Sequence, residues 1–182
     1  MQILYYPEPA LRKKAVPIKL EVRRVLGGNV NHVGDYQEKA EKMLELMYEA
    51  CGVGLAANQV GWLERLVVKD ETGEQKGERV FINPEIIHSE GETLEEEGCL
   101  SLPGIFGKVS RARKVVVVAY NLKGERLEME AEDLPARVWQ HEIDHLNGTL
   151  IIDRMTPASR LAASKRLKEL EEMYREAVDS GQ

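Results

Sequence analysis

Two of the four histidines in this 182-residue chain lie four positions apart, at His141 and His145. In an α-helix this spacing rotates the second side chain by only about 40° from the first, so both imidazoles can face one metal ion. Glu142 follows the first histidine, where a carboxylate can act as the general base toward a metal-bound water. A catalytic divalent metal usually has three protein ligands. The stretch therefore predicts a hydrolytic metal site that needs one more ligand.

The chain has two cysteines, Cys51 and Cys99, too few for a disulfide framework. Cys51 completes the apolar stripe of a helix predicted over residues 36–50, so it is interpreted as a buried core residue. Cys99 lies in a segment that Pro103 and several glycines keep from forming a regular helix, and a thiolate there could be directed at a metal. The pattern therefore favours Cys99 as the missing ligand.

The glycine-rich residues 52–61 could let the backbone approach a ligand or another segment closely. They lack the GxGxxG spacing of a dinucleotide site and the Lys-Ser/Thr pair of a phosphate loop. Taken alone, they are interpreted as a tight turn packed under a sheet.

Four runs with β-branched or alternating side chains predict a mostly antiparallel sheet, and they cover residues 65–70, 79–87, 114–120 and 125–131. Residues 121–124 are predicted to form a hairpin turn between the last two runs. Residues 27–34 have the composition of a loop, and residues 149–152 suggest one more short strand.

The two histidines belong to a predicted helix that Asp133 caps, with Pro135 in its first turn. Its apolar residues form two stripes, which predicts a helix covered on most sides. Pro157 opens a final helix whose docked face is expected to contain Leu161, Leu167, Leu170 and Tyr174.

The length is that of one domain, expected over residues 1–182. A net charge of −6 argues against a broad nucleic-acid surface, so DNA is not an expected partner. The start of the chain lacks the pattern of a signal peptide, and no run is long enough to span a membrane. We therefore expect a cytoplasmic protein.

Three stretches, GVGLAANQ, EGCLSLP and QHEIDHLNG, occur in this order along the chain. Together they resemble the three signature motifs of the peptide deformylases, which remove the N-formyl group from new bacterial proteins. An HExxH helix alone would also fit zinc proteases. The similarity extends from residues 7–12 to the final helix, with one departure at Asn58, where family members commonly carry proline or another residue.

The resemblance implies an α+β fold, with mostly antiparallel sheets around a central HExxH helix and a C-terminal helix. It implies one divalent metal bound by Cys99, His141 and His145. In this family the metal is generally ferrous iron, Fe2+, and zinc (Zn2+) or nickel (Ni2+) can occupy the site.

The resemblance also implies roles for residues around the metal. Glu142 would be the general base and later the acid. The Gln59 side chain and the backbone N–H of Leu100 would face the oxyanion, and Gly54 would pair with the substrate backbone. The expected substrates are nascent polypeptides that begin with formylmethionine, and the ribosome is a potential partner through the final helix.

Two other functions fit parts of the sequence. A zincin-like metallopeptidase would use the same His pair and Glu142 but predicts a further ligand downstream, where no histidine follows His145 and Asp153 is the remaining candidate. A non-catalytic, metal-binding module that docks on the ribosome would leave Glu142 dispensable.

Overall fold

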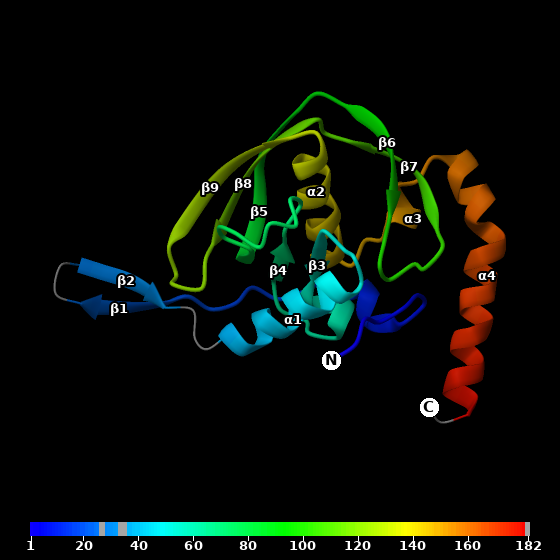
Figure 1. Ribbon diagram of the computed structural model, residues 1–182, viewed down its shortest axis with the longest axis horizontal. Helices are drawn as coiled ribbons and strands as arrows, with labels where there is room; N and C mark the ends of the chain where they lie inside the picture. Colours follow the sequence, from blue (N-terminus) through cyan, green and yellow to red (C-terminus); the bar gives the residue numbers. More distant parts are fainter. Residues whose placement is uncertain (26–27, 33–35, 181–182) are drawn as a thin grey trace.

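The computed structural model describes residues 1–25, 28–32 and 36–180, with the backbone alone for residues 22–25 and 28–32. Its five-stranded sheet is antiparallel throughout, in the order β3 (Gly54–Ala56), β4 (Leu66–Lys69), β5 (Val80–Glu90), β8 (Lys114–Tyr120) and β9 (Arg126–Glu132) (Figure 1). Two antiparallel pairs join β1 (Glu21–Val25) to β2 (Gly28–His32) and β6 (Thr93–Gly98) to β7 (Phe106–Arg111).

Four α-helices and two short 3-10 helices accompany the strands in the described part of the chain. They are η1 (Pro9–Arg12), α1 (Gln37–Glu49), η2 (Ala57–Val60), α2 (Leu134–Leu146), α3 (Ile151–Arg154) and α4 (Pro157–Asp179). The predicted α+β class, with mostly antiparallel sheets and a C-terminal helix, is confirmed. None of the described helices is both long and apolar enough to cross a membrane.

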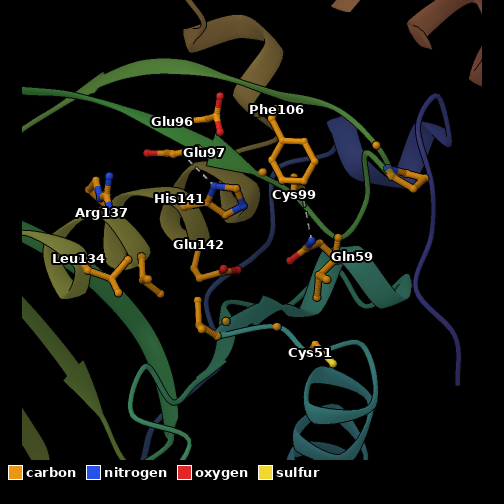
Figure 2. Close-up of a pocket in the computed structure, with 18 residues that line it drawn as sticks. Cys51, Gln59, Glu96, Glu97, Cys99, Phe106, Leu134, Arg137, His141 and Glu142 are labelled. Atoms are coloured by element: carbon orange, nitrogen blue, oxygen red, sulfur yellow. Dashed lines mark hydrogen bonds and ion pairs between the residues drawn. The ribbon is translucent and has the colours of Figure 1, made fainter.

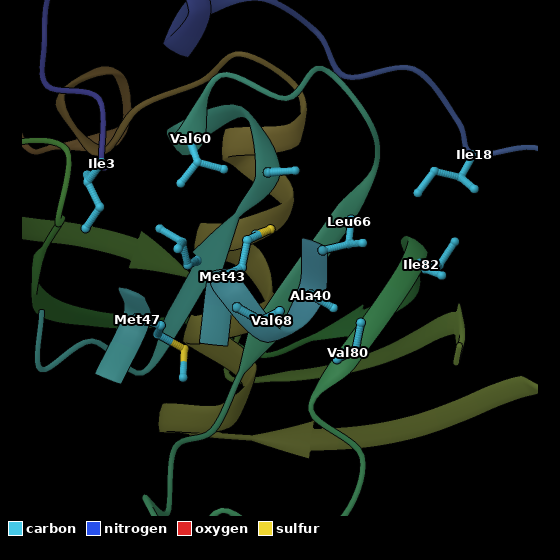
Figure 3. Close-up of a cluster of buried hydrophobic side chains, with 12 residues drawn as sticks. Ile3, Ile18, Ala40, Met43, Met47, Val60, Leu66, Val68, Val80 and Ile82 are labelled. Carbon is cyan, nitrogen blue, oxygen red and sulfur yellow. The ribbon is translucent and has the colours of Figure 1, made fainter. Parts of the chain in front are cut away.

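Successive side chains of a strand point to opposite sides, and β4 together with the first three residues of β5 is buried on both faces. On one face lies a cluster to which α1 contributes Ala40, Met43 and Met47 and the strands contribute Leu66, Val68, Val80 and Ile82 (Figure 3). On the other face, Val67 and Phe81 pack toward α2. The ring of Phe81 meets that of Trp139 edge-on, with centroids 4.7 Å apart. The sheet therefore gives α2 a rigid apolar support.

Helix α2 begins after Asp133 with Pro135 in its first turn, as predicted. The fixed φ of proline suits this position, where no intrahelical N–H bond is needed. Asp133 makes no side-chain capping bond, because its carboxylate accepts a hydrogen bond from Arg113 Nε at 3.2 Å instead. Figure 1 shows α2 between β5, β8 and β9 on one side and β6 and β7 on the other.

The end of α1 corrects the interpretation of Cys51. The helix stops at Glu49, and Cys51 has a left-handed φ of 54° and an exposed side chain. Its N–H donates to the carbonyl of Tyr48, as at many helix ends. The stripe prediction was wrong here because the chain leaves the helix before this residue. Asp35, which together with Glu38 resembles a capping box for this helix in the sequence, lies outside the described residues.

Other elements depart from the predictions in identifiable ways. The four expected strands are present, but β1, β3, β6 and β7 were not predicted. Residues 149–152 do not form a strand, since α3 occupies Ile151–Arg154 and Asp153 accepts a bond from the Leu150 N–H. The loop expected over residues 27–34 is wrong where the backbone is described, because β2 spans Gly28–His32.

The final helix α4 starts at Pro157, as predicted, and Thr156 caps it by accepting a hydrogen bond from the Ser159 N–H. Leu170 is buried against the body, but Leu161 is 76% exposed and does not dock. Its place on the predicted face was wrong because Ala163, not Leu161, makes the contact at the start of the helix.

Gly148 ties the end of α2 to the N-terminal segment. Its φ is +74°, and a Cβ there would collide with the backbone carbonyl of Arg12. Gly73 offers a matched control, since its φ is +68° and no atom of the described residues lies within 4 Å of its Cβ position.

We expect Gly148→Ala to lower the free energy of unfolding by about 3 kcal/mol or more. About 1–2 kcal/mol of this is the left-handed conformation itself, and the remainder is the backbone collision. Gly73→Ala should show only the cost of the left-handed conformation, because no collision occurs there. Denaturant unfolding of both variants measures the difference, and equal losses would mean that the collision relaxes without cost.

Candidate active site

The candidate metal ligands come from two elements that meet in space. His141 and His145 lie on α2, and Cys99 follows directly after the end of β6. The Nε2 atoms of the two histidines are 3.2 Å apart, and Cys99 Sγ lies 3.2 Å from His145 Nε2. One donor atom from each of the three residues lies within 4.8 Å of the others. The sulfur and the two nitrogens therefore converge on one point.

A buried charge network holds the first histidine. His141 Nδ1 lies 3.2 Å from Glu97 Oε2, and Arg111 donates to both oxygens of Glu97 at 2.9 and 3.0 Å. Arg111 also pairs with Asp144, which Arg154 contacts from the other side at 2.8 Å. Burial would raise the pKa of Glu97, but the bonds from His141 and Arg111 outweigh it and lower that pKa to about 2. Glu97 is therefore an ionised acceptor that fixes the His141 ring.

Glu142 has the environment of a general base. It is only 3% exposed, and its Oε2 has no hydrogen-bond partner among the described residues. Burial raises the pKa of Glu142 to about 7, because an unpaired carboxylate is poorly solvated in a protein interior. A carboxyl group with this pKa can both take up and release a proton near neutral pH.

The buried Gln59 side chain lies opposite Glu142 (Figure 2). Its Oε1 accepts a hydrogen bond from the Ala56 N–H at 2.8 Å, which fixes the orientation of the amide. Its Nε2 then donates to Ser101 Oγ at 3.1 Å and lies 3.8 Å from Cys99 Sγ. The amide N–H groups of Gln59 are thus held beside the candidate ligands.

A cavity of about 510 Å³ opens over these groups. The described residues that line it include Gly54, Gln59, Cys99, Leu100, His141 and Glu142, together with the apolar side chains of Leu134, Val138 and Phe106. Figure 2 shows Glu96 and Arg137 at the same cavity. Its apolar wall and convergent polar groups are typical of a small-ligand site.

The structure thus brings together all seven residues that the sequence singled out, around one cavity and one cluster of donor atoms. Asp153 is not among them, because its carboxylate pairs with Arg12 on the surface. Sequence reasoning missed Glu97 and Arg111. The only available signal was the position of Glu97 two residues before Cys99, and nothing local distinguished Arg111 from a surface arginine.

Gly54 lies unusually close to the candidate base. A Cβ at this position would be 2.5 Å from Glu142 Oε1, so any larger residue must move either β3 or the carboxylate. We expect Gly54→Ala to lower kcat/KM by about 100-fold, the scale for a displacement of a catalytic group by about 1 Å. Steady-state kinetics and metal analysis of the purified variant test this.

Retained metal with reduced turnover would agree with a displaced Glu142. Kinetics like those of the wild type would show that the carboxylate can move aside without cost. Gly73→Ala, in a turn outside the cavity lining, controls for a general effect of adding a methyl group.

Comparison with known proteins gives a consistent match. The family model described as polypeptide deformylase matches residues 1–161. A peptide deformylase of Chromobacterium violaceum is 42% identical over 171 residues, which cover 94% of this chain and 96% of the relative. One from Thermodesulfovibrio yellowstonii is 44% identical over 170 residues, covering 92% of this chain and 96% of the relative.

Solved structures agree with these matches. A peptide deformylase from Legionella pneumophila has a TM-score of 0.80 and 40% identity, covering 96% of both chains. Peptide deformylase 1B from Arabidopsis thaliana, solved with an inhibitor, has a TM-score of 0.85 and 34% identity, covering all of this chain and 95% of that one. The similarity therefore spans the whole arrangement that positions the candidate site.

Proposed function

The chain belongs to the polypeptide deformylase family, metal-dependent enzymes that remove the N-formyl group from new proteins. On this premise we propose which of its residues bind the metal, transfer the proton and stabilise the developing charge. The observation that carries the proposal is the convergence of Cys99, His141 and His145 beside the buried carboxylate of Glu142. A zincin-like peptidase is not favoured, because Asp153 is engaged elsewhere.

Cys99, His141 and His145 are proposed to hold one divalent metal. Their donor atoms fit such an ion, since one sulfur and two Nε2 atoms converge and Glu97 engages the other nitrogen of His141. A thiolate with two imidazoles suits zinc, nickel or ferrous iron, and ferrous iron is the proposed ion in the cell. When bound, the metal supplies Lewis acidity, which lowers the pKa of water toward about 7 and polarises a carbonyl.

Glu142 is proposed to move the proton. As a carboxylate it accepts a proton from the attacking water, and as a carboxylic acid it then gives that proton to the amine nitrogen that leaves. The pKa of about 7 supports both steps, because a group that titrates near the working pH is neither too weak a base nor too weak an acid. Formate and a peptide with a free amino terminus are the products.

Gln59 and Leu100 are proposed to stabilise the charge that develops on the formyl oxygen. The Gln59 amide is held by the Ala56 N–H through its oxygen, so its N–H groups stay directed toward the site. The backbone N–H of Leu100, next to Cys99 in the cavity wall, is the second donor. Each such donor contributes about 3 kcal/mol to the stability of a transition state when it is well aimed.

The cavity supports a formylmethionine substrate. Leu134, Val138 and Phe106 give it an apolar wall, which suits an unbranched thioether side chain. Strand β3 is at the edge of its sheet, so Gly54 is proposed to pair with the substrate backbone as an added strand would. A formyl carbon bears only hydrogen, and a tight site near Gly54 and Glu142 would exclude bulkier acyl groups.

Residues 1–182 are proposed to act as one domain in the cytoplasm, on nascent polypeptides that carry formylmethionine. The exposed face of α4, with Leu161 and Met173, is a candidate contact with the ribosome.

Formate release from formylmethionyl peptides tests the activity directly. The protein is purified without oxygen, loaded with ferrous iron or nickel, and assayed beside the matched acetylmethionyl peptides. We expect formate from the first substrate and little hydrolysis of the second. No formate with either metal would overturn the proposed function.

A further inference from the structure

Asn58 is completely buried and directly contacts the helix that carries both histidines. It lies on η2, one residue before Gln59, and its exposed fraction is 0%. Its Nδ2 donates a hydrogen bond to the backbone carbonyl of His145. A buried asparagine that donates to the backbone of a candidate metal ligand is well placed to influence that ligand.

Each of these two residues also has one buried polar atom without a partner among the described residues. Neither Asn58 Oδ1 nor His145 Nδ1 has a hydrogen-bond partner within the described part of the chain. An unsatisfied buried group costs about 1–3 kcal/mol, and most such groups in native proteins are paired. The two atoms are complementary, because amide oxygen accepts a hydrogen bond and imidazole Nδ1 donates one when Nε2 holds the lone pair.

Nδ1 of His141 has a partner, whereas Nδ1 of His145 has none among the described residues. Glu97 engages Nδ1 of His141 at 3.2 Å, which leaves Nε2 of that ring toward the donor cluster. Metal-bound histidines almost always donate their other ring N–H to an acceptor that fixes tautomer and orientation. For His145, Asn58 Oδ1 is an unpaired buried acceptor on a residue that is already hydrogen-bonded to the His145 backbone.

We propose that Asn58 is a positioning residue for His145, whose Nδ1 proton its amide oxygen accepts through one bridging water. The Nδ2 donor bond to the His145 carbonyl holds the amide in place, and the oxygen then keeps His145 in the tautomer that presents Nε2 to the metal. This role rests on the metal site proposed above. One ligand histidine thus has a charged partner and the other a neutral one.

Substitutions at Asn58 separate this role from simple packing. Asn58→Asp keeps an acceptor oxygen and loses the donor, whereas Asn58→Leu keeps the approximate volume and loses both. Asn58→Val gives the same comparison if the leucine variant does not fold. Asn121→Leu is the matched control, because Asn121 is also buried but holds the turn before β9 by accepting from the Lys123 and Glu125 N–H groups.

Nickel affinity is measured by competition with a chelator on metal-free protein. Loss of an outer partner of this kind typically weakens metal binding by about 10- to 100-fold. We expect that loss for Asn58→Leu and a smaller loss for Asn58→Asp, which keeps the acceptor oxygen but not the donor bond that holds it. Asn121→Leu should show no change. In the zinc-loaded protein, ¹⁵N NMR should show a protected Nδ1 proton on His145 that disappears in Asn58→Leu.

Two results would overturn the role of Asn58. One is a folded leucine or valine variant with wild-type nickel affinity and an unchanged His145 signal. The other is an aspartate variant as weak as the leucine variant, which would mean that only the packing or the donor bond matters. If the wild type itself bound no nickel, the proposed metal site would fail first, so the two failures are distinguishable.

Discussion

Glu142→Gln is expected to lower kcat by about 100- to 10,000-fold, the usual contribution of a general acid-base group. The amide has nearly the same shape as the carboxylate but can neither accept nor return the proton at neutral pH. Glu142 does not belong to the donor cluster of Cys99, His141 and His145, so the metal content should be unchanged. Turnover and metal stoichiometry on the same preparation check both statements.

Stability gives this variant a second readout. Burial raises the pKa of Glu142 to about 7, which means that the ionised carboxylate is disfavoured in the folded protein. A neutral amide removes that cost, so the melting temperature should stay the same or rise. Glu45→Gln, on the exposed side of α1, controls for the loss of a glutamate. Substantial turnover in Glu142→Gln would mean that a different group is the base.

Cys99→Ser is expected to weaken metal binding by at least about 100-fold. Loss of an outer partner alone costs about 10- to 100-fold, and a serine hydroxyl remains protonated at neutral pH, so one anionic ligand disappears. The donor atoms of the two histidines remain, which predicts residual weak binding. Metal analysis after gel filtration and chelator competition measure the effect, and formate release should fall in parallel.

Cys51→Ser is the matched control for the thiol. Cys51 is exposed at the end of α1 and is not part of the donor cluster in the described residues, so this variant should retain its metal. Equal metal loss in both variants would indicate general damage to the fold. Metal retained in Cys99→Ser would remove this residue from the ligand set.

The local features of this chain could be predicted from the sequence because they depend on neighbouring residues. The four-residue spacing of His141 and His145 places both on one face of any helix, and Glu142 necessarily lies beside them. Strand β8 was predicted with its observed bounds, Lys114–Tyr120, since its run of β-branched residues needs no tertiary context. The three motifs, in their order along the chain, indicated the family.

Other elements were not predicted because their local pattern is weak or misleading. Strand β6 carries a run of three glutamates and ends in glycine, a composition that disfavours strands, and pairing with β7 stabilises it instead. The apolar residues 150–152 resemble a strand, but Asp153 caps the Leu150 N–H and starts a helical turn. A short apolar run does not distinguish the two by itself.

The sequence by itself determined the spacing of the candidate ligands, the candidate base beside them and the family to which the chain belongs. Only the tertiary structure decided which distant groups surround them: Glu97 against His141, Gly54 against Glu142, and Asn58 against His145, 87 residues away in the chain. The physical reason is that periodicity fixes directions only within one element. Contacts between elements depend on how the sheet, β6 and η2 pack around α2, and buried polar atoms must find partners in that packing.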